Sequence, residues 1–183
     1  MAAAIAGVSP APLRLFFALW PTPAQQDTMA AVASQMQRQC GGRRVATPLL
    51  HLTLAFLGET APERVTELTR LAAAIEFTPF SLTLTRAGVW SRSGIGWLAP
   101  ADIPAPLQTL VDQLNAALGQ AGFPLEHRRF KPHVTVLRKA LRVPAAPLAV
   151  EMSWPVAGFA LLQSTLGRGG PAYRVLAAWP GQP

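Results

Sequence analysis

Several features that would assign a chain to a common class are missing from this sequence. A single cysteine, Cys40, cannot form an internal disulfide, which favours a reducing compartment. No apolar run reaches the roughly 18 residues that a membrane span requires. The apolar opening, residues 1–12, lacks the basic segment typical of a secretory signal. We therefore expect a cytoplasmic protein that does not cross a membrane, with residues 1–12 as a flexible leader.

Acidic residues are also scarce. Nine Asp and Glu face 16 Lys and Arg, which gives a formal net charge of +7. A positive field of this kind suits an anionic partner, and the planar guanidinium of arginine matches the oxygens of phosphate groups. A coding bias towards arginine explains the same composition equally well. Charge alone therefore indicates nucleic acid or phosphate without identifying a substrate.

The order of the predicted elements indicates an α+β fold. With 183 residues, of which 50% are hydrophobic, the chain can form one domain or two small lobes that share a core. Thr22 is expected to cap the first helix, and Thr60 and Glu63 to form a capping box at the second. Period-two alternation and apolar runs predict strands at 13–20, 49–58, 80–86, 88–90, 95–100, 130–140, around 150, 159–166 and 173–179; helical spacing predicts helices at 23–40, 63–75 and 104–122. Residues 142–149 are expected to form a surface connection.

Two of the three histidines open the same four-residue pattern, His51-Leu52-Thr53-Leu54 and His133-Val134-Thr135-Val136. Chance places a threonine in this setting after a given histidine on the order of one time in a hundred, and two such events are much rarer. Residues two apart on a strand point to the same face, so each histidine shares a face with its threonine while the apolar residues enter the core. The surrounding strands and helices recur loosely in both halves, which predicts two related lobes.

Polar stripes of this kind are costly to bury without partners, so they are expected to face a cleft or a ligand. Two histidines with pKa values near neutrality can supply a general acid and a general base, and two hydroxyls can donate hydrogen bonds to phosphate oxygens. This combination suits phosphoester transfer. No third histidine, cysteine pair or carboxylate stands at ligand spacing near either motif, so neither a metal nor another cofactor is expected.

The motifs and their flanks resemble those of a known family. The segments RLFFALWP (14–21), HLTLAFLGE (51–59) and FKPHVTVLRKA (130–140) are similar to the two-histidine phosphoesterase superfamily, and most similar to the bacterial RNA 2′,3′-cyclic phosphodiesterases, also called 2′-5′ RNA ligases. The resemblance covers residues 13–180. It implies a single bilobal domain over residues 13–183, with two antiparallel sheets lining a central cleft, helices on the outside and pseudo-two-fold internal symmetry.

The resemblance also implies roles for individual residues. His51 would act as the acid and His133 as the base, and Thr53 and Thr135 would hold the phosphate. A 2′,3′-cyclic phosphate end of RNA would open to a 2′-phosphomonoester, with reversible 2′-5′ RNA ligation as a further activity. Phe56 and Arg138 stand five positions after the histidines and resemble the pair that brackets a nucleobase. Strict alternation places these two side chains on the wrong face, so each strand needs a bend or bulge. The segment GVWSRSGIGW (88–97) departs from the family pattern, which leaves substrate length open.

Two other functions remain open on this reading. A non-catalytic RNA-binding module would use the basic cleft without turnover, and a related phosphodiesterase would act on small cyclic nucleotides, ADP-ribose cyclic phosphate or linear 2′-5′ oligonucleotides. A monomer is the default state. Core positions are expected for Phe16 and Phe17, and are favoured over base stacking for Trp90 and Trp97. His127 is expected to be a surface or supporting residue, and Arg128, Arg129 and Lys131 either guide RNA or are simply solvated.

Overall fold

The structure is a computed structural model that describes residues 11–126, 128–144, 148, 150–167 and 170–180. Residues 1–10 of the expected leader, His127 and part of the expected 142–149 connection lie outside the described residues. The strands are β1 (Leu13–Leu19), β2 (Arg43–Arg44), β3 (Leu52–Thr60), β4 (Phe80–Leu84), β5 (Arg86–Trp90), β6 (Ile95–Ala99), β7 (Val134–Arg138), β8 (Met152–Val156), β9 (Gly158–Gly167) and β10 (Gly170–Pro180). The α-helices are α1 (Pro23–Cys40), α2 (Val65–Ala73) and α3 (Ala105–Gln120), and short 3-10 helices span Thr47–Leu49 and Pro62–Arg64.

Helix α1 follows the sequence signals closely. Its N-cap is Thr22, whose hydroxyl accepts from the backbone N–H of Gln25 while the Gln25 side chain accepts from the backbone N–H of Thr22. This reciprocal capping box satisfies two helix donors that have no partner inside the helix. Helix α3 buries the whole predicted apolar stripe, namely Leu107, Leu110, Val111, Leu114 and Leu118.

The second predicted capping box does not form. Thr60 is the last residue of β3, where it is buried, and its hydroxyl donates to the carbonyl of Gly58. Helix α2 begins after a 3-10 turn, with Arg64 at its N-cap and no side-chain cap. The strand thus continues two residues beyond the expected turn at Gly58, and strand pairing with β1 outweighs the local capping signal.

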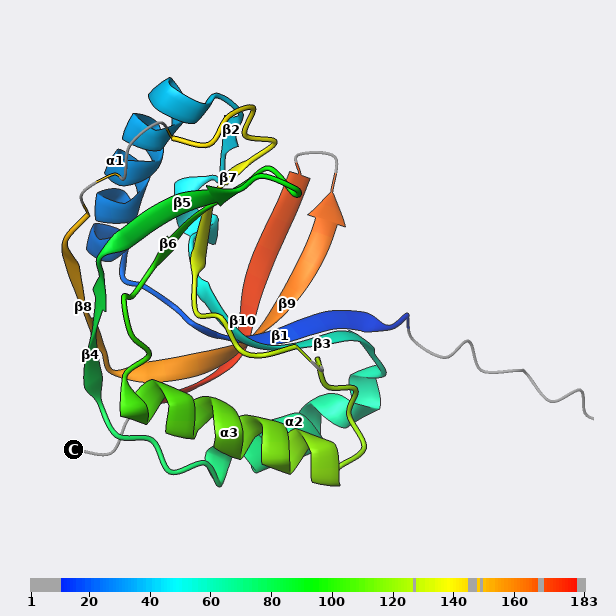
Figure 1. The fold of residues 1–183 in the computed structure, drawn as a ribbon. Helices are drawn as coiled ribbons and strands as arrows, with labels where there is room; N and C mark the ends of the chain where they lie inside the picture. Colours follow the sequence, from blue (N-terminus) through cyan, green and yellow to red (C-terminus); the bar gives the residue numbers. More distant parts are fainter. Residues whose placement is uncertain (1–10, 127, 145–147, 149, 168–169, 181–183) are drawn as a thin grey trace, which may run out of the picture.

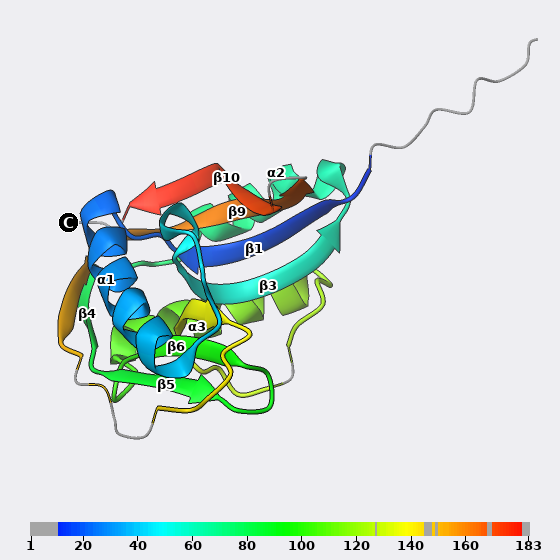
Figure 2. The ribbon, with the colours of Figure 1, turned by 90° about the horizontal axis from the view of Figure 1, so that it is seen from above.

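All described strand pairs are antiparallel and form two sheets, which confirms the α+β prediction. Eight strands form one sheet in the order β10-β9-β1-β3-β7-β6-β5, with β2 added beside β7, and β4 pairs with β8 in the other. Helix α1 packs on β2 and β7, while α3 packs on β3, and α2 on α3 and β10. Figures 1 and 2 show α1 on one side of the strands and α2 with α3 on another.

The large sheet narrows where its two halves meet. Strands β3 and β7 pair at a single position, Leu52 opposite Val134, and both residues are fully buried. The main core cluster runs through both halves, from Leu15 on β1 to Leu161 on β9. The predicted core residues Phe16 and Phe17 are buried, Phe16 in a smaller cluster with Ala18, Ala160 and Leu162.

The prediction that Trp90 and Trp97 belong to the core is wrong. Trp90 is 37% exposed, and Trp97 is half-buried opposite Thr135 in the β6–β7 pairing. Directly opposed residues share a face, so Trp97 lies on the face of that threonine. Among the described residues, no helix is long and apolar enough to cross a membrane.

The connection before β2 depends on glycine. Gly42 has φ of 83°, and a Cβ there would lie 2.8 Å from the backbone of Ala140 and from the carbonyl oxygen of Arg138. Gly122, which follows α3, has φ of 72° with nothing within 4 Å of its Cβ position. Both sites favour glycine, but only Gly42 also excludes a methyl group by collision.

We expect Gly122→Ala to lower the free energy of unfolding by about 1–3 kcal/mol through backbone strain alone. Gly42→Ala carries the same strain plus a backbone collision, so its loss is expected to be larger. Urea unfolding of the two variants beside the wild type measures the difference. Equal losses in the two variants would show that the chain relaxes around Gly42 and that the contact with β7 is loose.

Candidate active site

The two motif histidines occupy equivalent local positions. His51 immediately precedes β3 and His133 immediately precedes β7. Nδ1 of His51 lies 2.7 Å from the carbonyl oxygen of Leu49, and Nδ1 of His133 lies 2.8 Å from that of Lys131. A carbonyl oxygen only accepts, so Nδ1 carries a hydrogen in both rings and Nε2 is left for a ligand.

A side chain of helix α1 holds the backbone directly before His51. The buried side chain of Gln26 donates a 3.2 Å hydrogen bond to the carbonyl of Leu50, the residue before His51. The 3-10 helix Thr47–Leu49 turns the chain so that Leu50 is extended. Sequence reasoning missed Gln26 because a glutamine in an amphipathic helix gives no signal that it is buried.

The Leu52–Val134 pair brings the two motifs together. In an antiparallel ladder the residue before one partner lies across from the residue after the other. His51 therefore approaches Thr135 while Thr53 approaches His133. Because Leu52, Leu54, Val134 and Val136 are buried, the histidines and threonines occupy the opposite face of these strands, as predicted.

A β-bulge in each motif strand changes the alternation, as expected from the positions of Phe56 and Arg138. The β1–β3 register shifts between Phe17 and Ala18, so β3 contains an extra residue between Thr53 and Phe56. The β6–β7 register shifts between Gly96 and Trp97. In β7 the consecutive residues Val136 and Leu137 are both buried, and Arg138 is exposed. Each bulge returns the fifth residue after the histidine to the face of its threonine.

His51 sits among aromatic rings. Its ring centroid lies 5.0 Å from that of Phe16, 5.8 Å from Trp20 in a stacked arrangement, and 5.1 Å from Tyr173 at an edge. Burial lowers the pKa of His51, and the Leu49 carbonyl partly opposes this effect. The positive charges of His133 and Arg138 lower the pKa further.

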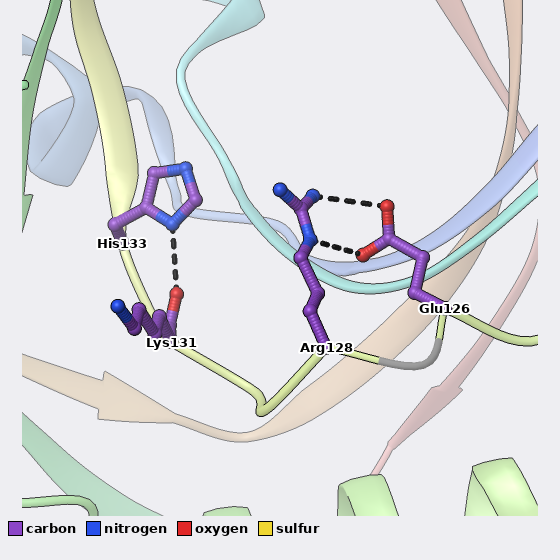
Figure 3. A network of polar contacts seen from close by, with 4 residues as sticks. All are labelled: Glu126, Arg128, Lys131 and His133. Carbon is purple, nitrogen blue, oxygen red and sulfur yellow. Dashed lines mark hydrogen bonds and ion pairs between the residues drawn. The ribbon is translucent and has the colours of Figure 1, made fainter. Parts of the chain in front are cut away.

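His133 has a more polar setting. Trp90 meets it edge-on, with ring centroids 4.7 Å apart. Burial lowers the pKa of His133, the Lys131 carbonyl raises it, and the charges of Arg128 and Glu126 act in opposite directions. Figure 3 shows the Arg128–Glu126 pair, with hydrogen bonds of 2.9 and 3.0 Å, beside the histidine. The pair is exposed, so it contributes little to stability.

A pocket of about 690 Å³ opens beside His133. Three of the six predicted site residues, His133, Thr53 and Phe56, line it. Its wall also includes Trp90, Asn115, Leu118, Leu125, Phe130 and the basic residues Arg128, Arg129 and Lys131. The sequence left two roles open for these basic residues, guidance of RNA and simple solvation. The structure places all three in the wall of the pocket.

Phe56 and Arg138 are not in contact in this structure. The guanidinium over the Phe56 ring belongs to Arg14 on β1, 4.9 Å from the ring centroid. The sequence reading did not identify three neighbours of the site, Arg14, Trp20 and Tyr173. The pairing of β1 with β3 brings Arg14 and Trp20 there, and Tyr173 arrives on β10, which is joined to β1 through β9. Tyr173 is the single tyrosine of the chain, but its position next to His51 becomes evident only once β10 is known to lie beside β9.

No group of three His, Cys, Asp or Glu side chains that could hold a metal ion is found in the described part of the chain. The polar groups of the site include imidazole nitrogens, threonine hydroxyls and guanidinium groups, with Asn115, Lys131 and the ion-paired Glu126 in the wall of the pocket. These groups can transfer protons and donate hydrogen bonds to an anion. The arrangement is therefore suited to acid–base chemistry at a phosphate.

Comparison with known proteins gives one consistent result. A family model described as the 2′-5′ RNA ligase superfamily matches residues 21–168. The RNA 2′,3′-cyclic phosphodiesterase of Escherichia coli K12 is 37% identical over 170 residues, which cover 92% of this chain and 96% of that protein. The protein of the same name from Thermus thermophilus is 32% identical over 176 residues, 90% of this chain and 88% of its own. The crystal structure of E. coli LigT complexed with 3′-AMP superposes with a TM-score of 0.86 at 35% identity, covering 94% of this chain and 99% of that one.

The charge of Arg138 provides a test of the geometry around His51. In the free protein both histidines are expected to titrate below pH 6.5, because burial disfavours their charged forms. Arg138→Gln removes a neighbouring positive charge, so protonation of His51 becomes easier and its pKa rises. NMR titration of the two imidazoles measures these values. Arg44→Gln is the matched control, and an unchanged His51 pKa in Arg138→Gln would place Arg138 away from the site.

Proposed function

The chain belongs to the 2′-5′ RNA ligase superfamily, and from this premise we propose that it is a phosphodiesterase that opens 2′,3′-cyclic phosphate ends of RNA to 2′-phosphomonoesters. The observation that carries the proposal is the pair of motif histidines, each with Nδ1 on the carbonyl two residues earlier and Nε2 left for substrate. Relatives named RNA 2′,3′-cyclic phosphodiesterase, matched over 90% or more of this chain, support the same activity.

The proposed hydrolysis uses one imidazole for each proton transfer. Nε2 of His133 accepts a proton from water as its oxygen attacks phosphorus. The bond from phosphorus to the ribose 3′ oxygen breaks, and Nε2–H of protonated His51 delivers a proton to that oxygen. The products are a 2′-phosphomonoester and a free 3′ hydroxyl. If the 5′ hydroxyl of a second RNA end replaces water, the same two proton transfers form a 2′-5′ phosphodiester and release the 3′ hydroxyl, which is ligation. In the backward cleavage of that linkage the two histidines exchange roles by microscopic reversibility.

The threonines supply donors for the phosphate. Thr53 and Thr135 lie on the histidine face, each across the β3–β7 junction from the other motif's histidine. Their hydroxyls are proposed to donate to the non-bridging oxygens, where negative charge increases as phosphorus becomes five-coordinate. Phe56 is proposed to stack on the nucleobase from the wall of the pocket, with Arg138 on the other side of the base. Related lobes joined at Leu52 and Val134 account for the symmetric placement of these groups.

This chemistry needs no metal ion, because the two imidazoles carry both protons and the hydroxyls stabilise the phosphate. With excess EDTA, we expect hydrolysis of a 2′,3′-cyclic nucleotide and of an oligonucleotide with a cyclic phosphate end to continue. His51→Ala and His133→Ala are each expected to lose roughly 100- to 10,000-fold in kcat, since general acid–base catalysis contributes this much. Chromatographic separation of the 2′-phosphate product measures the rates.

His127→Ala is the matched control, because it removes the third histidine, which stands outside both motifs. Its rate is expected to equal that of the wild type. Substantial activity in either motif variant would refute the assigned roles. RNA binding without turnover in the wild type would favour the non-catalytic binding module, and turnover restricted to small cyclic nucleotides would exclude RNA ends as substrates.

The threonine hydroxyls can be tested without changing side-chain shape. Thr53→Val and Thr135→Val remove a donor and keep the branched side chain, so kcat is expected to fall by roughly 10- to 1,000-fold with a smaller change in KM. Thr53→Ser and Thr135→Ser retain the hydroxyl and are expected to keep most of the wild-type rate. Serine variants as slow as the valine variants would show that the threonines act through packing.

A further inference from the structure

Two arginines lie directly opposite each other on neighbouring strands. Arg43 of β2 pairs with Arg138 of β7, and both are exposed. Like charges in this position repel and destabilise the strand pair. Within the described part of the chain, neither guanidinium forms a hydrogen bond or ion pair with another side chain. An anion between the two groups would offset their repulsion.

The register determines which face the pair occupies. Arg44 lies opposite buried Leu137 and donates a 2.6 Å hydrogen bond to Ser34 on α1, so Arg44 points towards the helix. Consecutive residues of a strand point to opposite faces. Arg43 therefore points away from α1, to the face on which Arg138 lies and from which its charge acts on His51. The pair stands at the end of β7 remote from His133, near the position of β2 in Figure 1.

Two unusual backbone conformations hold this pair in place. Lys139, directly after Arg138, is the one described non-glycine residue with a positive φ, 54°. Gly42, directly before Arg43, packs its backbone against Arg138 and Ala140 so closely that no Cβ fits. The side chain of Gln37 donates a 2.9 Å hydrogen bond to the Gly42 carbonyl. A left-handed lysine costs stability, so the fold tolerates strain directly beside the position where it pairs the two arginines.

The segments around the pair contain no compensating acids. No Asp or Glu occurs in residues 28–58, 77–101 or 127–150, which supply most of α1 together with β2, β5, β6 and β7. The same segments carry Arg38, Arg43, Arg44, Arg86, Arg92, Arg128, Arg129, Lys131, Arg138, Lys139 and Arg142. These segments therefore carry positive charge without acidic residues of their own, which attracts phosphate groups.

We propose that Arg43 and the edge of the Arg138 guanidinium, whose flat face is left for the base, form a second anion subsite that binds the 5′-linked phosphate of the nucleotide whose cyclic phosphate reacts at the histidines. The inference rests on the proposed function and defines its substrate class: ends that carry a phosphate on the 5′ oxygen, either the phosphodiester of an RNA chain or the 5′-phosphate of a small nucleotide. A guanidinium fork suits such a group because it can donate two parallel hydrogen bonds to phosphate oxygens.

The test adds one phosphate to one substrate. Cytidine 2′,3′-cyclic phosphate is compared with the same molecule phosphorylated on its 5′ oxygen, and with a dinucleotide that ends in the same cyclic phosphate. In the wild type we expect kcat/KM to rise by about tenfold or more with the 5′-phosphate, mainly through a lower KM. The dinucleotide is expected to share the gain. Thermal unfolding confirms that each variant is folded.

Arg43→Gln is expected to reduce the ratio between the phosphorylated and unphosphorylated substrates to about one. Arg44→Gln removes the same charge one residue away on the opposite face and is expected to keep the ratio. Equal loss in both variants would overturn the subsite in favour of a diffuse field. A wild-type ratio near one, an equal fall with both substrates in Arg43→Gln, or a gain confined to chains longer than a dinucleotide would overturn it as well.

A binding experiment distinguishes failure of the subsite from failure of the proposed function. Calorimetric titration with cytidine 3′-monophosphate and cytidine 3′,5′-bisphosphate needs no turnover, and the bisphosphate is expected to bind about tenfold more tightly in the wild type but not in Arg43→Gln. If the cyclic substrates are hydrolysed and the two ligands bind equally, the subsite fails while the proposed function stands. If no cyclic substrate is hydrolysed, the proposed function fails, and equal binding of the two ligands would then exclude the subsite also.

Discussion

The pairing of Leu52 with Val134 is the contact on which the arrangement of the site depends. Both side chains are fully buried, and each is flanked in the sequence by a histidine and a threonine. A shift of one residue in this register would expose the apolar residues and bury the polar ones, at a large cost in free energy. The hydrophobic core therefore orients the imidazoles and hydroxyls, although none of these polar groups contributes to the core.

The bulges bring to the face of the site two residues that regular alternation would place on the opposite face, Phe56 and Arg138. A strand with strict period two can present the histidine and threonine but not a residue five positions after the histidine. One extra residue in β3 and one in β7 correct the phase, and in both strands two consecutive apolar side chains enter the interior at the bulge. The core thus accommodates the irregularity, and Phe56 and Arg138 are brought to the face of the site.

The sequence predicted the parts of the molecule that local pattern determines. Helix α3, the alternation in β4 and the histidine and threonine face all follow from periodicity, and the bulges follow from an inconsistency between periodicity and the family resemblance. The features that sequence reasoning missed depend on pairing between distant segments. Thr60 extends β3 because β1 pairs with it. Trp90 reaches the pocket because β5 pairs with β6 and β6 with β7, and Arg43 meets Arg138 only when β2 joins β7. No window along the chain contains both members of these pairs.

The electrostatics of the site connect substrate binding to proton transfer. In the empty protein, burial and the charges of His133 and Arg138 lower the pKa of His51, so the free histidine is neutral at physiological pH. A general acid must instead be protonated. A cyclic phosphate carries a negative charge, and an anion beside His51 favours the imidazolium and opposes both effects. On the proposed mechanism, burial, with smaller contributions from His133 and Arg138, keeps His51 neutral until the phosphate arrives, so the acid form is generated in the complex in which it is used.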